Sequence, residues 1–352
     1  MPAGTVRTRP AAADGWAWHG RFCHAVPVHV PSDAISPDAP VAPRASDGGA
    51  ARVSAAPKRI ADATPARPLL DAPRLADFLS AAGTDFGLTV VSEIDSTNAA
   101  LVRVARAQTA ATAPTETSPT SPTEAELAEV GRRWRQVDAP RGHVLVAERQ
   151  VAGRGRLDRS WESRVGAGLT VSLLVRPMVE PARLGWLPMV VGTALVSAVR
   201  RVTGVTASLK WPNDLLVDGA KLAGILVELV PAPAIPPAAV IGFGLNVHAQ
   251  SDELPPRSTS LSLCGAPTSA LDRTTLLGEL LTELAGALVR WERDPMSARA
   301  DYLAVCATIG RRVRVELPGG RTHLGTAMDV DAEGRLVVDG HPFSAGDVVH
   351  LR

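Results

Sequence analysis

The sequence predicts an α+β domain followed by a small antiparallel β domain. Between residues 69 and 290, apolar runs typical of buried strands alternate with amphipathic patterns typical of helices. From residue 309 onward the chain instead shows short alternating strands separated by glycine turns, as in RVRVEL, HLGTAMDV and DAEGRLVVDG. Such a pattern is typical of small barrel-like β domains. We therefore place the domain boundary near residue 305.

The composition excludes several classes of protein. The chain has 352 residues, enough for two domains, and its net charge of +1 comes from 37 basic and 36 acidic residues. This near-neutral balance gives no global basic field for nucleic acid. Cys23, Cys264 and Cys306 lack CxxC spacing, so neither a zinc site nor a disulfide framework is predicted. One pair could form a disulfide, but a reduced cytoplasmic setting is simpler. Because no apolar run reaches bilayer length and no signal peptide is visible, we expect a soluble cytoplasmic protein.

Two segments lack the pattern of a folded element. Residues 1–66 are rich in Ala, Pro, Asp and Ser, and proline fixes its own backbone angle and lacks a donor, so we expect a disordered extension. An insertion at about 107–125 consists mostly of Ala, Thr, Pro, Ser and Glu. It is too polar to pack, so we expect it to be flexible.

The remaining elements are predicted from hydrophobic periodicity, and their ends are predicted from turn-forming residues. The expected helices cover residues 69–82, 99–108, 124–135, 184–202 and 274–290. The expected strands cover residues 88–94, 143–148, 168–175 and 239–247, with a hairpin within 208–229. The run at 168–175 is apolar on both faces, which predicts a central, buried strand.

The stretch 147–161, AERQVAGRGRLDRSW, leads from a buried strand into a loop in which glycines alternate with arginines. Gly153 and Gly155 let the backbone approach a ligand closely. Arg154 and Arg156 carry forked donors that suit carboxylate and phosphate. This composition favours a loop that holds an anionic small molecule. Taken alone, GRGR is equally typical of an exposed or nucleic-acid-binding run, so the rest of the chain must decide.

Ser96, Thr97 and Asn98 lie between the first strand and a helix. These residue types cap helices, because their side-chain oxygens accept the unpaired amides of the first turn. A plain cap is the simpler interpretation. The same junction also exposes hydroxyls and amides to a ligand.

The segment 208–229 contains Asp218-Gly219 between two apolar runs, which predicts a tight hairpin turn. Lys210 and Lys221 lie in this apolar surrounding, where a lysine is costly unless its charge meets an anion. Either side chain could instead extend to solvent. The tetrapeptide Trp211-Pro212-Asn213-Asp214 predicts a rigid corner that presents an amide and a carboxylate.

The apolar run 239–247 contains Gly242 and Gly244, which permit close approach of another group to the strand. Asn246 is polar at the end of this run. It either caps a turn or binds a ligand.

Taken together, these segments resemble the biotin protein ligases over about residues 88–247, and the small C-terminal β domain agrees with that resemblance. Four motifs occur in the family's order, and together they are far more specific than any one of them. They are Ser96-Thr97-Asn98, the loop from Gln150 to Trp161, Lys210-Trp211-Pro212-Asn213-Asp214 with Lys221-Leu222-Ala223-Gly224-Ile225, and Gly242-Phe243-Gly244-Leu245-Asn246-Val247.

The resemblance implies a mixed sheet flanked by helices, of the biotin/lipoate ligase, class II synthetase-like kind. It implies a catalytic domain over residues 67–305 and a C-terminal SH3-like β-barrel over 306–352. The implied reaction has two steps, with biotin and ATP as substrates and Mg²⁺ accompanying ATP near Asp214, without a dedicated protein metal site. Biotin is first activated to biotinyl-5′-AMP and is then transferred to a lysine of a biotin carboxyl carrier domain.

The resemblance also implies roles for individual residues. Arg154 and Arg156 would clamp the biotin carboxylate and the phosphate, and Lys221 would neutralise charge around the reacting oxygens. Ser96, Thr97 and Gln150 would face the biotin ring. The full set of residues expected to contact the substrates is Ser96, Thr97, Asn98, Gln150, Gly153, Arg154, Gly155, Arg156, Arg159, Trp161, Lys210, Asn213, Lys221 and Asn246.

The chain departs from the family pattern at Asp158, which stands where the loop usually has a third glycine. An acidic side chain near an anion site should weaken binding unless it points outward or pairs with Arg159. Some family members carry an N-terminal helix-turn-helix domain, but the residues before Leu69 are too rich in Pro and Ala to form one. We therefore expect a ligase without repressor function, acting on the carrier domain of an acyl-CoA or pyruvate carboxylase. We expect a monomer or weak homodimer that binds neither nucleic acid nor membrane.

Three other functions compete with this one. A lipoate or octanoyl transferase of the same fold is the nearest, but the GRGR loop and the KWPND corner favour biotin. A non-catalytic biotin or adenylate sensor would be expected to lack Lys221 or the paired arginines, which are present. A nucleic-acid-binding protein is disfavoured because no aromatic residues interleave with the loop arginines.

Overall fold

The computed structural model describes residues 67–109, 142–157, 159–231, 236–317 and 319–351. The expected N-terminal extension, nearly all of the expected insertion, the expected helix at 124–135 and Asp158 lie outside these ranges.

Among the described residues, seven strands form one mixed sheet in the order β1-β2-β3-β7-β6-β5-β4. The strands are β1 (Phe86–Ile94), β2 (Gly142–Gln150), β3 (Gly168–Val175), β4 (Ser208–Lys210), β5 (Asp214–Val217), β6 (Ala220–Val230) and β7 (Ala238–Asn246). β1 and β2 run parallel, whereas the other neighbours are antiparallel. The mixed sheet expected from the resemblance is therefore confirmed.

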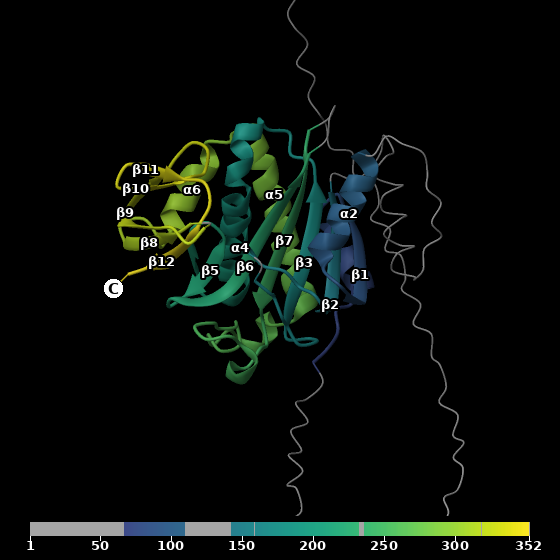
Figure 1. The fold of residues 1–352 in the computed structure, drawn as a ribbon. Coiled ribbons are helices and arrows are strands. Elements are labelled where there is room, and N and C mark those ends of the chain that lie inside the picture. The colour runs from purple at the N-terminus through teal and green to yellow at the C-terminus, as the bar shows by residue number, and fades with distance from the viewer. Residues whose placement is uncertain (1–66, 110–141, 158, 232–235, 318, 352) are drawn as a thin grey trace, which may run out of the picture.

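Helices cover both faces of this sheet (Figure 1). One face carries α1 (Ala72–Ala81), α4 (Leu187–Thr203) and α5 (Arg273–Arg293) over the larger apolar core. The other face carries α2 (Thr97–Thr109), whose leucine, valine and alanine side chains pack on β2, β3 and β7. Because both faces are covered, every residue of β3 is buried, as its uninterrupted apolar run predicts.

The hairpin predicted at Asp218-Gly219 joins β5 to β6. Both turn residues have positive φ, 51° and 81°, which matches the two-residue turn that suits antiparallel strands. One helix escaped the sequence prediction: α6 (Ser297–Val305) follows α5 closely and buries Ala298 and Tyr302.

A second, five-stranded antiparallel sheet forms the C-terminal part, in the order β11-β10-β9-β8-β12. Its strands are β8 (Arg312–Glu316), β9 (Thr322–Val330), β10 (Leu336–Val338), β11 (His341–Phe343) and β12 (Asp347–His350). The sheet lies beside α4 and α6 (Figure 1).

Two tryptophans of the first domain attach the second. Trp186 Nε1 donates to the Ala332 carbonyl at 3.0 Å, and Trp211 Nε1 donates to the Gly334 carbonyl at 3.1 Å. Both indoles are almost fully buried. The apolar core also runs continuously from one domain into the other, so the second sheet packs directly on the first domain.

The segment Pro181–Thr203, which contains α4 and the 3₁₀ turn before it (Pro181–Trp186), is long and apolar enough to span a membrane by length and composition. Two thirds of its most apolar window is buried inside the fold. Its apolar character is therefore explained by its place in the core between the sheet and α5.

Candidate functional site

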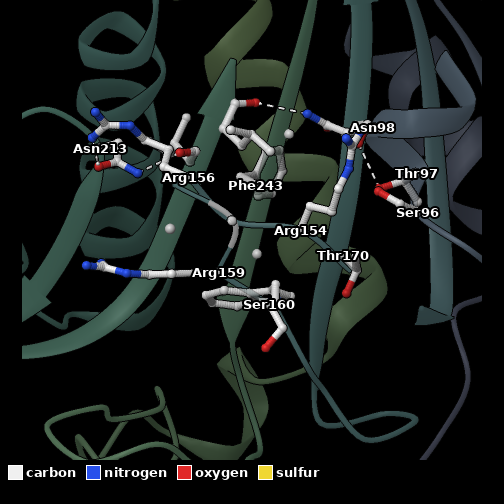
Figure 2. A pocket seen from close by; sticks show the side chains of 18 of the residues that line it. Ser96, Thr97, Asn98, Arg154, Arg156, Arg159, Ser160, Thr170, Asn213 and Phe243 are labelled. Atoms are coloured by element: carbon white, nitrogen blue, oxygen red, sulfur yellow. Dashed lines mark hydrogen bonds between the residues drawn. The ribbon is translucent and has the colours of Figure 1, made fainter. Parts of the chain in front are cut away.

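A narrow cavity of about 100 Å³ opens on the face of the sheet that carries α2. Its walls come from the β1–α2 junction, the end of β2, the Gly/Arg loop (residues 151–161), and strands β3, β5, β6 and β7, with Asp347 contributed by the second domain. Figure 2 shows the side chains converging on this cavity. All four sequence motifs therefore meet at one place.

The two glycines of β7 form the floor, and each lies directly beneath a side chain. A Cβ on Gly242 would lie 2.1 Å from Asn98 Oδ1, and a Cβ on Gly244 would lie 2.1 Å from Trp161 Cε2. Gly224, which pairs with Gly244 across the sheet, also lies under the Trp161 indole. Only glycine permits these contacts, which explains the Gly-x-Gly pattern.

One end of the cavity is lined by neutral polar groups. Gln150 Oε1 accepts hydrogen bonds from the Thr97 amide at 2.8 Å and from Thr97 Oγ1 at 3.0 Å. Ser172 Oγ lies 2.7 Å from Thr97 Oγ1 and 2.6 Å from Asn98 Oδ1. The Ser96 hydroxyl accepts the amide of Ala99 at 3.4 Å, so the junction acts as a helix cap and as a pocket wall together.

The other end is cationic. Lys221 Nζ lies 2.7 Å from Asp214 Oδ1, and Lys210 Nζ lies 3.4 Å from the other carboxylate oxygen. The Lys221 ammonium also lies 5.9 Å from the centre of a Trp161 ring, within cation–π range. Asp214 therefore holds Lys221 at the edge of the pocket.

Arg156 lies at this same end. It donates to Asn213 Oδ1 at 3.0 Å and to the Gly346 carbonyl at 3.3 Å. Burial lowers the pKa of the Arg156 guanidinium, Asp214 opposes this, and Arg159 adds to it. Arginine nevertheless stays charged in proteins, so Arg156 provides a partly desolvated cation that faces the pocket.

The two arginines of the GRGR sequence point in opposite directions (Figure 2). Arg156 extends toward Asn213, whereas Arg154 extends toward Asn98 and lies 3.4 Å from Glu228 Oε1. Glu228 also accepts a hydrogen bond from Asn98 Nδ2 at 2.9 Å. In this conformation the arginines do not form one common clamp; each serves a different end of the cavity.

The Gly/Arg loop folds back on itself as a small hairpin. The Trp161 amide donates to the Gly153 carbonyl at 3.0 Å, and the backbones of Arg154 and Ser160 form an isolated antiparallel β-bridge. A Cβ on Gly153 would lie 2.2 Å from the Trp161 carbonyl, so this position requires glycine. Arg159 forms an ion pair with Asp347 at the start of β12. The second domain thus contacts the loop directly.

Three expected contact residues do not line the cavity. Lys210 lies behind Asp214, and Asn246 is buried with its amide donating to the Thr259 carbonyl at 2.9 Å. Asn246 thus contacts the segment that follows β7, and its expected contact with a ligand stays a prediction. Gly153 belongs to the loop and packs against the Trp161 backbone, away from the cavity lining. The remaining expected residues line the cavity: Ser96, Thr97, Asn98, Gln150, Arg154, Gly155, Arg156, Arg159, Trp161, Asn213 and Lys221.

Sequence reasoning missed several lining residues. Thr170 and Ser172 are the polar members of an otherwise apolar strand, and their two-residue spacing places both on the pocket face. That spacing is a signal that could have identified them. Asp347 has no local signal, because its place depends on how the two domains pack. Among the residues that the structure describes, no cluster of three or more His, Cys, Asp or Glu side chains could hold a metal ion.

Comparison with known proteins agrees with this geometry. Residues 121–246 match the biotin/lipoate A/B protein ligase family, and residues 308–351 match the biotin protein ligase C-terminal domain. The biotin–[acetyl-CoA-carboxylase] ligase of Mycobacterium tuberculosis is 39% identical over 295 residues, covering 81% of this chain and 97% of that protein. The chain belongs to the biotin protein ligase family.

Two other ligases are also similar to this chain. The bifunctional ligase/repressor BirA of Escherichia coli is 33% identical over 215 residues, which cover 59% of this chain and 66% of that protein. The biotin protein ligase of Aquifex aeolicus, solved in complex with biotin and ATP, superimposes with a TM-score of 0.54 at 24% identity, covering 75% of this chain and 98% of that one. The last comparison supports the ligase fold for both domains together.

Proposed function

We propose that this chain is an ATP-dependent biotin protein ligase. The observation that carries the proposal is the polarity of the cavity: at one end Thr97, Gln150 and Ser172 offer neutral hydrogen-bonding groups and Arg154 is paired with Glu228, whereas the other end holds Arg156 and Lys221. Biotin has the matching polarity, with a neutral ureido ring joined by an apolar tail to a carboxylate. Thr97, Gln150 and Ser172 would contact the ring, and the Trp161 indole would cover the tail.

In the first step a biotin carboxylate oxygen attacks the α-phosphorus of ATP. A mixed anhydride forms, and the bond to the β-phosphate breaks to release pyrophosphate. Charge grows on the phosphoryl oxygens in the transition state, where preorganised cations are most effective. Arg156 and Lys221 are the cations of the described pocket that lie at this end.

Lys221 would change partners during this step. Its ammonium is held by Asp214, and an incoming phosphate would compete for it. Asp214 already faces two ammonium groups, so it is poorly suited to bind Mg²⁺ in this state. Mg²⁺ would therefore enter bound to the phosphates of ATP, as is usual for this ion, rather than to a protein cage.

In the second step the uncharged amine of an acceptor lysine attacks the biotinyl carbonyl. An amide bond forms, AMP leaves with the electron pair of the broken anhydride bond, and the lysine proton passes to solvent. A recess of about 770 Å³ lies on the other side of the Gly/Arg loop and shares Arg154, Arg156 and Arg159 with the cavity. It provides a route for an acceptor when the loop moves.

The partner proposed for this second step is the biotin carboxyl carrier domain of an acyl-CoA or pyruvate carboxylase. We propose that residues 67–305 form the catalytic domain and 306–352 the C-terminal domain. We further propose a cytoplasmic monomer or weak homodimer that binds neither nucleic acid nor membrane. Sedimentation with and without biotin and ATP would measure the oligomeric state.

The decisive experiment follows the mass of the acceptor. The protein is mixed with MgATP, a purified carrier domain and either biotin or lipoate. We expect one biotin added to one lysine of the carrier, and no lipoate. Lipoate transfer in place of biotin transfer would overturn the assignment, and it would favour the lipoate transferase of the same fold.

A further inference from the structure

The backbone of Lys221 is held by a segment that has no assigned role, residues 248–261. β7 ends at Asn246, so beside the first residues of β6 this segment takes the place of a neighbouring strand. The Lys221 amide donates to the Arg257 carbonyl at 2.7 Å, and the Thr259 amide donates to the Lys221 carbonyl at 2.9 Å. The position of Lys221 therefore depends on where this segment lies.

The segment is anchored at its other end through Glu253. Arg67 lies 2.7 Å from the Glu253 carboxylate, and the two side chains are only 13% and 4% exposed. Arg67 also donates to the His248 carbonyl at 3.3 Å, and Arg164 approaches Glu253 at 3.4 Å. Burial by itself would raise the pKa of the Glu253 carboxyl, but the hydrogen bonds from Arg67 and from the Gln250 amide, with the charges of Arg67 and Arg164, together outweigh burial and lower this pKa.

The stretch between the two contacts is stiff. Three residues separate Glu253 from Arg257, and two of them are Pro255 and Pro256, whose rings fix φ. Arg257 itself has φ of 62°, a left-handed conformation that is costly for a residue other than glycine. This conformation directs its carbonyl to Lys221. A displacement at Glu253 is thus passed to Lys221 with little opportunity to be absorbed.

We infer that Arg67 is a positioning residue for Lys221, acting through Glu253 and the Pro255-Pro256 link. The inference rests on the proposed function, because it gives Lys221 its task in adenylation. The ring-binding end is formed by Thr97, Gln150 and Ser172, none of which contacts this segment. Loss of Arg67 should therefore slow adenylation without weakening the binding of biotin.

The first test compares Arg67→Ala, Arg67→Lys and Arg74→Ala with the wild type. Arg74 is the matched control, since it also pairs with a carboxylate, Asp272, near the start of the described chain but does not contact the segment. We expect Arg67→Ala to lower kcat for pyrophosphate release about fivefold while the Kd for biotin, measured by calorimetry, stays unchanged. Arg67→Lys should recover most of the rate, and Arg74→Ala should match the wild type.

The second test repeats Arg67→Ala in a Lys221→Ala background. If Arg67 acts through Lys221, the second substitution adds almost nothing once the lysine side chain is gone. A general loss of stability would instead slow both backgrounds by the same factor. An unchanged kcat in Arg67→Ala, a weakened biotin Kd, or equal effects in both backgrounds would overturn the inference.

These outcomes are distinct from failure of the proposed function. A wild-type protein that forms no biotinyl adenylate contradicts the proposed function, and the inference falls with it. A wild-type protein that is active while Arg67→Ala equals it contradicts the inference alone.

Discussion

The Gly244→Ala substitution tests the pocket floor with a single methyl group. Its Cβ would lie 2.1 Å from Trp161 Cε2 and 2.4 Å from Cζ2. Ordinary carbon contacts are ~3.5–4.0 Å, so the indole must move by roughly 1.4 Å or more. The β7 backbone cannot retreat, because β7 pairs with β3 on one side and with β6 on the other. Trp161 therefore has to leave its position.

The expected cost follows from what the indole covers. A large apolar side chain that loses its packing forfeits about 1.5–3 kcal/mol. Because Trp161 lies on a loop rather than in the main core, we expect most of this cost to appear in ligand binding and little in folding. Biotin should bind about 10- to 100-fold more weakly, with a change in the free energy of unfolding below ~1 kcal/mol.

Calorimetric titration with biotin measures this effect, and Gly224→Ala is the matched control. Its Cβ would lie 3.1 Å from Lys221 Cε, a contact that the flexible lysine can relieve, and 3.3 Å from Trp161 Cζ3, where a shift of a few tenths of an ångström is sufficient. We expect Gly224→Ala to stay within about threefold of the wild type. In a Trp161→Ala background, Gly244→Ala should cause no further loss. Wild-type biotin affinity in the Gly244→Ala protein would refute the proposed role of the indole as the cover of the pocket.

Three further outcomes are expected. Lys221→Ala should slow adenylation by at least ~100-fold, as for a lost electrostatic contact in a transition state; near-normal pyrophosphate release would contradict its role. Arg156→Gly should release biotinyl-5′-AMP early, so that bystander proteins become labelled; labelling confined to the carrier lysine in a mixed-protein mass assay would contradict the retention role. His350 has its pKa lowered to about 4 by burial, with Arg311 and Lys210 adding to the effect. Between about pH 6.5 and 4 the unfolded chain binds this proton and the folded chain does not, so stability falls as pH falls through that window. His350→Gln, which can keep the hydrogen bond to Thr308, should remove roughly 1 kcal/mol of this dependence after allowance for solvent screening. A difference in urea midpoint between the variant and the wild type that is the same at pH 7 and at pH 4.5 would contradict this expectation.

The sequence predicted the elements well where one physical signal was sufficient. The central strand β3 was identified because a strand covered on both faces must be apolar throughout. The β5–β6 turn was identified because Asp-Gly readily adopts the two positive φ values that the turn needs. The helix α6 was missed, since Ser297–Val305 buries only Ala298 and Tyr302 and so shows little periodicity.

The candidate site was predicted less completely, because the sequence does not show the direction in which a side chain points. Composition identifies Arg154 and Arg156 as anion-binding residues, but it does not show the direction in which each side chain leaves the loop, and in the structure the two extend to opposite sides. Their separation therefore depends on tertiary structure. Asn246 shows the same limit. A polar residue at a strand end can face the pocket or the next turn, and here the Thr259 carbonyl receives its amide.

The second domain contacts two of the arginines that line the pocket. Gly346 and Asp347 contact Arg156 and Arg159 on either side of the loop tip. An Arg156 that moves to a phosphate must give up the Gly346 carbonyl and Asn213, so ligand binding and domain contact compete for one guanidinium. The same competition holds for Lys221, which must leave Asp214. Under the proposed function both cations would therefore enter the reaction from partners already in place, and their positions would depend on Asp214, Asn213 and the second domain.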